Sequence, residues 1–305
     1  LYSVGATDLE TREGLMIAYE LDSSSAKLVE MDRRSTGGAA ACHIAFAESA
    51  NVVAVANYLG GSICATGIDG QGGFGETLQS IGHRGASVHP VRQTAPHPHS
   101  VTFDLAGKRA IACDLGTDQL LQYDIGGDAD TLLKTPPRIV QCASGVGPRH
   151  LAFHPSGSMI YVVNELTSSV SGFHYTAEQG LEEAFGTWST LPQGWSGMNL
   201  PAAIQFSRSG DRLYVSNRGH GSIATFIVDS TTGNLEPEGH ASSGGRIPRD
   251  LTLTPDGRAL VVANEEPGSL VALPIDGVTG KPGEVADCVE IPGAVSVVFE
   301  PRRSD

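Results

Sequence analysis

The chain contains 305 residues, of which 40% are hydrophobic, and its 34 acidic and 20 basic residues give a formal net charge of −14. A chain this acidic repels phosphate backbones and anionic membrane surfaces, so we expect neither a nucleic acid nor a membrane as a partner. No apolar run is long enough to span a bilayer, and no signal-peptide pattern follows Leu1, which predicts a soluble, cytoplasmic protein. The five cysteines lack a CxxC pair, which also fits a reducing compartment.

In chain order, the first expected elements are two strands within residues 1–22, LYSVG and GLMIAYELD. A repeated unit then occurs five times, at 42–69, 99–125, 149–175, 202–229 and 249–276. Each copy starts with a short strand of alternating apolar and polar residues, and most copies turn at a glycine into a second strand of small and β-branched residues. A third strand follows, and then a more variable stretch in which we expect a fourth strand.

Repeats of roughly 40 to 50 residues with four strands each indicate a β-propeller. The segment 294–299, AVSVVF, fits the period as an isolated first strand. We therefore predict an all-β fold, a single seven-bladed β-propeller domain over residues 1–305. Its blades have four strands, and parts of the first and last blades are not covered by this chain.

The second strands all end on a small polar side chain, namely Asn57, Asp114, Asn164, Asn217 and Asn264. A side chain that recurs in every copy most simply bonds the neighbouring backbone, so we interpret these residues as structural.

The residues next to the strand ends supply the candidate functional groups. In an up-and-down blade, the start of the first strand and the end of the second lie on one face. Tyr58 is one residue that reaches this face. Residues there that differ in type from copy to copy are our catalytic candidates, namely His99, Arg149, Glu165 and Arg218.

Two arginines, a carboxylate and a histidine suit a small anionic substrate that is converted by general acid–base chemistry. A metal ion held by His97, His99 and Glu165 is the competing interpretation. However, a spacing of two along a strand does not usually bring two imidazoles to one face, and nearby arginines would repel a cation. A Ser-His-Asp triad is disfavoured because no GxSxG motif occurs. We expect no metal and no other cofactor.

The candidate residues lie in stretches that resemble the lactonase family of seven-bladed propellers. This family includes the YbhE-type 6-phosphogluconolactonases and the fungal 3-carboxy-cis,cis-muconate lactonizing enzymes. Its most specific stretches here are ANYLGGSI, PHPHSVTFD, CDLGTDQLLQYDI, GPRHLAFHPSG, YVVNELTSSV, YVSNRGHGSIATF and PRDLTLTPDGR. The resemblance implies a site at the same His99, Arg149, Glu165 and Arg218.

Candidates for substrate binding come from these stretches and from two long segments, 70–97 and 186–201. We expect these segments to cross the active face and to help select the substrate. Trp188 and Trp195 lie in the second segment. The substrate-binding candidates are Arg92, His97, Asn199, His220 and Arg249.

The resemblance implies a lactonase that hydrolyses a sugar lactone such as 6-phosphogluconolactone. The alternatives are a 3-carboxy-cis,cis-muconate cycloisomerase, which needs the same residue types, and a non-catalytic interaction propeller, which predicts a large exposed apolar patch. The oligomeric state stays open.

Overall fold

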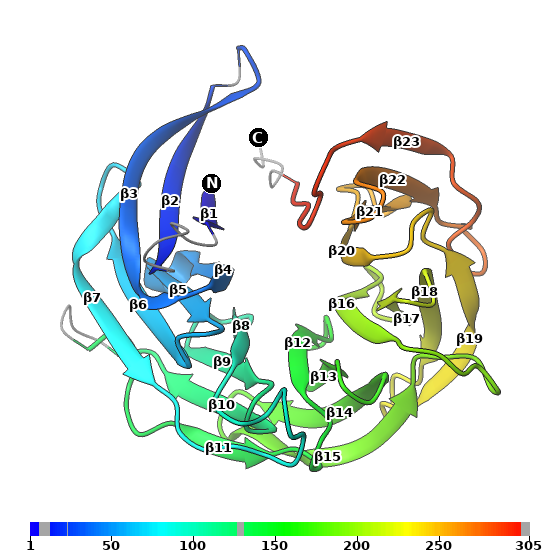
Figure 1. Ribbon diagram of the computed structural model, residues 1–305, viewed down its shortest axis with the longest axis horizontal. Coiled ribbons are helices and arrows are strands. Elements are labelled where there is room, and N and C mark those ends of the chain that lie inside the picture. The colour runs from blue at the N-terminus through cyan, green and yellow to red at the C-terminus, as the bar shows by residue number, and fades with distance from the viewer. Residues whose placement is uncertain (6–12, 23, 127–130, 300–305) are drawn as a thin grey trace. The chain divides into compact units, whose positions relative to one another are not determined.

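The computed structural model describes residues 1–5, 13–22, 24–126 and 131–299, which form six antiparallel β-sheets (Figure 1). Five of these sheets have four strands and the first has three, and the strands lie in chain order across each sheet. The chain divides into two compact units, Leu1–Arg149 and His150–Asp305, and we describe each unit by itself. The single domain over residues 1–305 stays a prediction.

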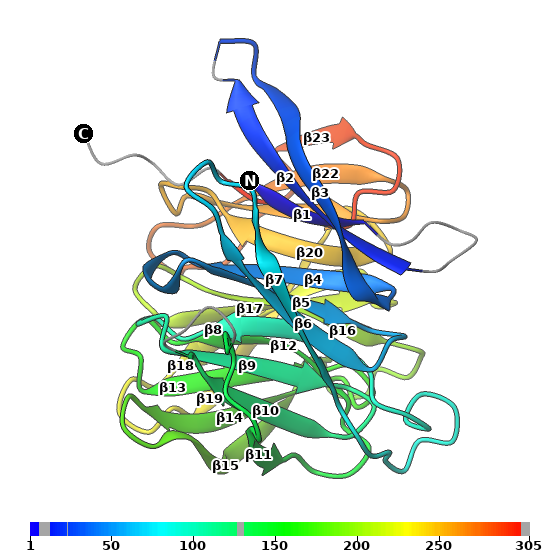
Figure 2. The same ribbon diagram turned by 90° about the vertical axis from the view of Figure 1, so that its left-hand side faces the viewer.

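The first unit holds the three-stranded sheet of β1 (Tyr2–Gly5), β2 (Glu13–Asp22) and β3 (Lys27–Ala39). The second sheet consists of β4 (Ala41–Ala47), β5 (Val52–Asn57), β6 (Ser62–Ile68) and β7 (Phe74–Gly82). The third consists of β8 (Pro98–Phe103), β9 (Arg109–Asp114), β10 (Gln119–Asp124) and β11 (Arg138–Gln141). In Figure 2 the β2–β3 hairpin extends beyond β1, which pairs only with the segment Leu15–Ala18 of β2.

The second unit holds three four-stranded sheets, the first of which starts at the boundary between the units. That sheet consists of β12 (Pro148–Phe153), β13 (Met159–Asn164), β14 (Ser169–Thr176) and β15 (Gly180–Ser189). The next consists of β16 (Leu200–Phe206), β17 (Arg212–Arg218), β18 (Ser222–Val228) and β19 (Leu235–Ser242). The last consists of β20 (Pro248–Leu253), β21 (Ala259–Asn264), β22 (Ser269–Pro274) and β23 (Asp287–Glu290).

Apolar residues on both faces of the inner strands form the cores. Every residue of β5 and of β13 is buried, which explains why these strands are nearly unbroken runs of small and β-branched residues. In the first unit, Val52 and Ala54 of β5 pack in one cluster with Leu121 and Tyr123 of β10. Neighbouring sheets within a unit therefore stack face to face. The five repeats and the expected fourth strand of each copy are confirmed.

Two expectations about the ends of the propeller need correction. The described residues form six sheets rather than seven. The predicted strand at 294–299 is not a strand, although the two predicted strands within 1–22 are present as β1 and β2. No ladder partner occurs for 294–299 among the described residues, and the Asp250 carboxylate instead accepts hydrogen bonds from Ser296 Oγ (2.9 Å) and Val297 N (3.0 Å).

The repeated side chains at the ends of the second strands are all completely buried. Asn217 Nδ2 donates to Thr190 O at 2.8 Å, and Thr190 follows β15, the outer strand of the preceding sheet. The other contacts of this kind are Thr36 Oγ1 to Asn57 Oδ1 (2.7 Å), His83 Nδ1 with Asp114 Oδ2 (2.7 Å) and Asn264 Nδ2 to Ser243 O (2.8 Å). The structural role predicted for these positions is confirmed. Four of the side chains bind a residue in or just after the outer strand of the preceding sheet, namely Asn57, Asp114, Asn217 and Asn264. Asn164 Nδ2 instead donates within its own sheet, to Ser169 Oγ (3.0 Å) and Ser171 Oγ (2.9 Å).

We expect Asn57→Ala to lower the free energy of unfolding by about 1–3 kcal/mol, because it leaves the buried Thr36 hydroxyl without this acceptor. Urea unfolding of the variant and of the parent protein measures the difference. Asn234→Ala, at an exposed position, is the control and should change little. Equal stability of the Asn57 and Asn234 variants would contradict the role given to this contact.

Candidate functional site

Tyr58, which directly follows β5, gathers three of the predicted site residues in the first unit. The His97 ring stacks on the Tyr58 ring with 4.6 Å between centroids, and the His99 ring meets it edge-on at 5.4 Å. Arg92 Nη2 donates to Tyr58 Oη at 3.2 Å, and His97 Nδ1 lies 2.9 Å from Tyr58 O. The segment 70–97 and the start of β8 thus bring an arginine and two histidines to one aromatic side chain.

Arg149, the second residue of β12, is the last residue of the first unit and is almost completely buried, with 2% of its surface exposed. Its charge acts on His43 of β4, a residue that the sequence did not single out. Burial lowers the pKa of His43 to about 4, and the Arg149 guanidinium contributes to the shift. Val101 N donates to His43 Nδ1 at 3.4 Å, which matches a neutral imidazole with that nitrogen unprotonated. The neutral ring adds no second positive charge beside Arg149.

Glu165 and Arg218, at the ends of β13 and β17, form an ion pair in the second unit. Arg218 Nη2 lies 2.6 Å from Glu165 Oε2, and their side chains are only 12% and 3% exposed. Arg218 Nε also donates to Leu200 O at 2.8 Å, which fixes the guanidinium on the first strand of its own sheet. The two side chains therefore meet as the up-and-down topology predicts, and a charge-assisted bond this short and buried holds both groups in place.

Arg249 and Glu265 form a second ion pair, within the sheet of β20 and β21. Arg249 Nη1 lies 3.0 Å from Glu265 Oε2, but these side chains are 34% and 39% exposed. The start of the first strand and the end of the second thus share one face in this sheet also. Because water screens an exposed pair, this bridge holds its arginine less firmly than Glu165 holds Arg218.

Asn199 and His220 lie together at the turn that follows β17. Asn199 Nδ2 donates to Ser168 Oγ (3.1 Å) and to Asn217 Oδ1 (2.9 Å), and its Oδ1 accepts from His220 N (3.2 Å). Both ends of the Asn199 amide are thus engaged in holding this turn. The His220 ring meets the Trp195 ring edge-on at 5.3 Å. Burial lowers the pKa of His220, and the nearby His240 adds to the effect.

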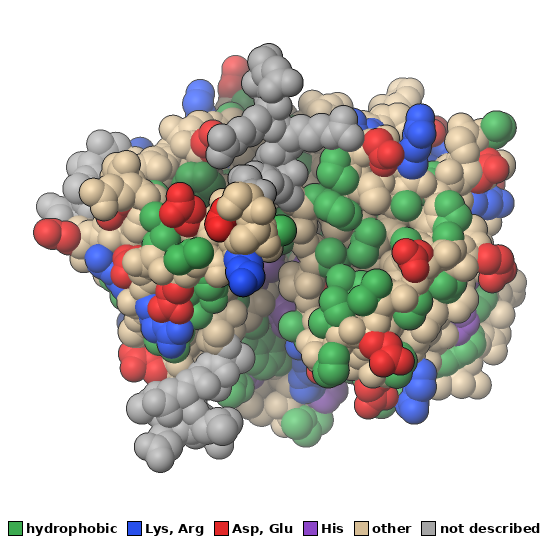
Figure 3. Space-filling view, turned by 90° about the horizontal axis from the view of Figure 1, so that it is seen from above, with side chains coloured by type: hydrophobic (Ala, Val, Ile, Leu, Met, Phe, Trp, Pro, Cys, Tyr) green, Lys and Arg blue, Asp and Glu red, His purple; other side chains and the backbone are tan. Residues whose placement is uncertain are grey.

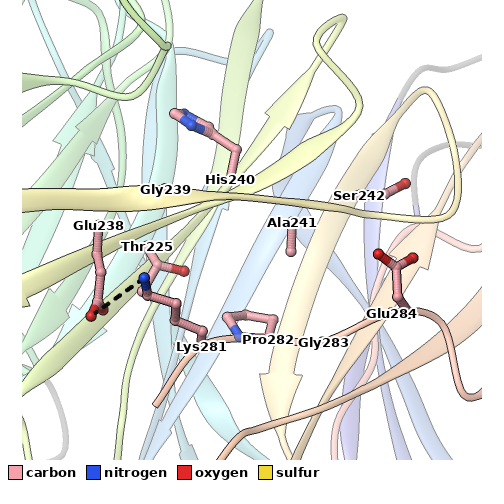
Figure 4. Close-up of a pocket in the computed structure, with 10 residues that line it drawn as sticks. All are labelled: Thr225, Glu238, Gly239, His240, Ala241, Ser242, Lys281, Pro282, Gly283 and Glu284. Carbon is pink, nitrogen blue, oxygen red and sulfur yellow. Dashed lines mark ion pairs between the residues drawn. The ribbon is translucent and has the colours of Figure 1, made fainter. Parts of the chain in front are cut away.

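Two hollows of the second unit lie along β19 rather than at Glu165 and Arg218. One, of about 900 Å³, is lined partly by Trp188 and Trp195 of the segment 186–201. The other, of about 430 Å³, is shown in Figure 4, where Glu238 and Lys281 point toward each other with 3.8 Å between Oε1 and Nζ. Both tryptophans that the sequence singled out thus line a groove at this outer strand.

Within the described ranges, no group of three or more His, Cys, Asp or Glu side chains is arranged to hold a metal ion. In the part of the chain that the structure describes, no helix combines the length and the apolar character needed to cross a membrane. On the face in Figure 3, exposed hydrophobic side chains lie between acidic and basic ones.

The predicted site residues fall into both units. The first unit holds Arg92, His97, His99 and Arg149, and the second holds Glu165, Asn199, Arg218, His220 and Arg249. Sequence reasoning missed His43 and underrated Tyr58. His43 stands one residue after the expected start of its strand, so only its proximity to Arg149 in the folded chain could reveal it.

Comparisons with known proteins agree with the resemblance drawn from the sequence. A family model described as "Lactonase, 7-bladed beta-propeller" matches residues 1–299. The chain is 34% identical over 247 residues to the uncharacterized protein YwcC of Lactococcus lactis, and 32% identical over 235 residues to a 6-phosphogluconolactonase of Bacillus subtilis. These alignments cover 81% and 77% of this chain but 69% and 65% of the relatives, so the chain spans about two thirds of their length.

A solved structure extends the comparison to the fold. The periplasmic gluconolactonase PpgL of Pseudomonas aeruginosa matches with a TM-score of 0.90 and 28% identity. The match covers 97% of this chain and 83% of that one. The chain therefore shares the all-β propeller fold of this protein.

The neutral state of His43 predicts a pH-dependent stability. In the unfolded chain this histidine binds a proton below pH 6.5, whereas in the folded protein it stays neutral down to about pH 4. The unfolded state thus binds more protons between these values, so the contribution is complete above pH 6.5 and is lost as the pH falls through 4. The pKa difference corresponds to at most roughly 3 kcal/mol.

As the pH is lowered from 7 to 4, the free energy of unfolding should therefore fall less steeply for His43→Gln than for the parent protein. His174→Gln, at an exposed position, is the control and should keep the parent slope. An unchanged slope in the His43 variant would contradict the assignment.

Proposed function

Because the chain belongs to the lactonase family of β-propellers, we propose that it is a lactone hydrolase. Its substrate is a sugar lactone such as 6-phosphogluconolactone, the compound from which the Bacillus subtilis relative takes its name. The observation that carries this proposal is the family match over residues 1–299. The buried Glu165–Arg218 pair supports it, since a passive surface has no need for charges that are this costly to bury.

The reaction needs an attacking water and a group that stabilises negative charge on the carbonyl oxygen. In the proposed step, Glu165 takes a proton from water while the water oxygen adds to the lactone carbonyl carbon. The Arg218 guanidinium, which stays charged at all working pH values, stabilises the resulting oxyanion. The ring C–O bond then breaks, and the leaving oxygen takes the proton from Glu165, which yields the hydroxy acid.

The residues of the first unit receive roles from their own geometry. Arg149 is buried and acts on His43, which stays neutral, and its guanidinium suits the binding of an anionic group of the substrate. His99 is a second candidate to activate water, since it is 93% buried beside Tyr58 and carries an imidazole suited to proton transfer. Arg92 and His97, which Tyr58 holds together, suit the binding of phosphate or carboxylate oxygens.

The remaining candidates in the second unit suit the hydroxyl groups or the carboxylate of the substrate. Arg249 presents a partly exposed guanidinium, and His220 presents an imidazole beside Trp195. Asn199 acts through the His220 turn, because its amide is already engaged there.

The rival functions receive less support. The relatives and the solved structure described above include a 6-phosphogluconolactonase and a gluconolactonase but no cycloisomerase. A non-catalytic propeller does not account for the buried ion pair. We further propose a small anionic substrate, without nucleic acid or membrane partners. We also propose a propeller of seven blades, the number in the family description. The cytoplasmic location stays a prediction, because the Pseudomonas aeruginosa relative is periplasmic.

The direct test follows acid release from 6-phosphogluconolactone and from glucono-δ-lactone, each corrected for spontaneous hydrolysis. We expect acceleration of at least one lactone, and a higher kcat/KM for the phosphorylated one because the candidate residues are rich in arginine. Loss of carboxymuconate absorbance, measured in parallel, tests the cycloisomerase. Purified protein that accelerates neither lactone would refute the proposed function.

We expect Glu165→Gln and Arg149→Ala each to lower kcat/KM by about 100-fold or more without unfolding the chain, because the first removes a base and the second a cation. The matched controls are Glu238→Gln, which removes an arginine-paired carboxylate on β19, and Arg109→Ala, which removes an aspartate-paired guanidinium on β9. Both controls should keep parental activity. Parental turnover by either site variant would remove that residue from the assignment.

A further inference from the structure

The turn between β9 and β10, residues 114–118, differs from the equivalent turns of the other four repeats. It carries two aspartates, Asp114 and Asp118, whose surfaces are completely buried. The residue pairs at the same two positions elsewhere are Asn57 and Gly61, Asn164 and Ser168, Asn217 and Gly221, and Asn264 and Gly268. A neutral pair is thus enough to form this hairpin, and the two carboxylates need another explanation.

Asp118 adopts a backbone conformation that favours glycine. Its φ is +54°, and the residues at this turn position in the other repeats also have positive φ values, with glycine in three of the four. Glycine adopts this conformation more readily than aspartate does, so the aspartate side chain must supply something that glycine lacks.

The Asp118 carboxylate binds two separate segments. Oδ2 accepts hydrogen bonds from Ser87 Oγ and from Gly145 N, both at 2.6 Å, and Oδ1 accepts one from Gly147 N at 2.7 Å. Both glycines have positive φ values and belong to no strand. The carboxylate therefore fixes the loop that ends two residues before Arg149.

Asp114 holds the segment that carries His97. Its Oδ1 accepts a hydrogen bond from His97 N at 2.8 Å, and Leu115 N donates to His97 O at 3.1 Å. The other carboxylate oxygen lies 2.7 Å from His83 Nδ1, and His83 Nε2 lies 3.0 Å from Tyr123 Oη. The His97 backbone is thus bound on both sides, and two buried side chains, His83 and Tyr123, hold the aspartate that binds it.

The turn also meets this segment through its backbone. Gln93 Nε2 donates to Leu115 O at 2.8 Å. At Gly116, a Cβ atom would lie only 2.0 Å from Ala95 O, so any other residue would push the two segments apart. One turn therefore binds both the segment of His97 and the loop before Arg149.

We propose that Asp114 and Asp118 are positioning residues for the hydrolysis, with Asp118 setting the place of Arg149 and Asp114 that of His97. This inference rests on the proposed function. The other repeats have an asparagine at the first position and a glycine or a serine at the second. A carboxylate holds irregular backbone more firmly than these residues do, because an ionised acceptor makes the stronger hydrogen bond. The same positions are neutral in the repeats that do not lead into Arg149.

The test compares Asp118→Asn and Asp118→Gly with Asp104→Asn. Asparagine and glycine both tolerate the positive φ, and asparagine also keeps the size of the side chain. Asp104 is the matched control, because its Oδ1 also accepts from backbone nitrogens, those of Lys108 (2.7 Å) and Arg109 (3.1 Å), at the turn that joins β8 to β9. We expect each Asp118 variant to lose about tenfold or more in kcat/KM, and Asp104→Asn to stay within about twofold of the parent.

A purely structural role would give the same losses in any background, so a double-mutant cycle separates the two cases. In an Arg149→Lys background, Asp118→Asn should cost little further activity, whereas Asp104→Asn should again behave as in the parent. Additive losses for Asp118→Asn and Arg149→Lys would overturn the positioning role.

Amide hydrogen exchange provides a readout that does not need activity. Gly145 and Gly147 should exchange at least tenfold faster in Asp118→Asn than in the parent, and as in the parent in Asp104→Asn. Unchanged exchange at both glycines would overturn the inference even if the protein is an active lactonase. Faster exchange in a protein that hydrolyses neither lactone would contradict the proposed function while the assigned clamp on the Arg149 loop stands.

Discussion

The fold depends on one buried contact, made where the second strand of a sheet ends. There a short polar side chain reaches the outer strand of the preceding sheet, as Asn217 does toward Thr190 and Asn57 toward Thr36. Apolar packing between sheets is strong but has no direction, so it does not by itself fix how one sheet lies on the next. Hydrogen bonds between completely buried groups supply that direction, because leaving either partner unsatisfied is costly.

This contact also explains where the chemistry of the chain is found. The residue after the buried side chain differs in type from repeat to repeat, as Tyr58, Glu165 and Arg218 do. Because the buried side chain just before it is held by hydrogen bonds, each of these groups has a defined position. Glu165 and Arg218, from neighbouring sheets, can therefore meet at 2.6 Å although 53 positions separate them in the chain.

In the second repeat, residues 99–125, the buried position itself is changed. Asp114 replaces the usual asparagine and pairs with His83, and Asp118 replaces the usual glycine or serine at the end of the same turn. Asp114 binds the backbone of His97, and Asp118 binds the backbone of Gly147. The turn therefore stabilises two segments that are not held by strand pairing. Such a turn suits a lactonase that works by the proposed mechanism. In that mechanism the charged groups are side chains, which the protein itself must hold in place.

The sequence by itself determined the strands of the five repeats, their grouping into sheets, the family and the structural role of the repeated asparagines. All of these follow from local patterns of burial that recur along the chain. It also predicted that Glu165 and Arg218 share a face, because that follows from strand direction alone. Only the tertiary structure decided that Tyr58 gathers Arg92, His97 and His99, that Asp118 binds Gly145 and Gly147, and that 294–299 is not a strand. These features depend on the path of irregular segments and on which partners they meet, and periodicity carries no information about either.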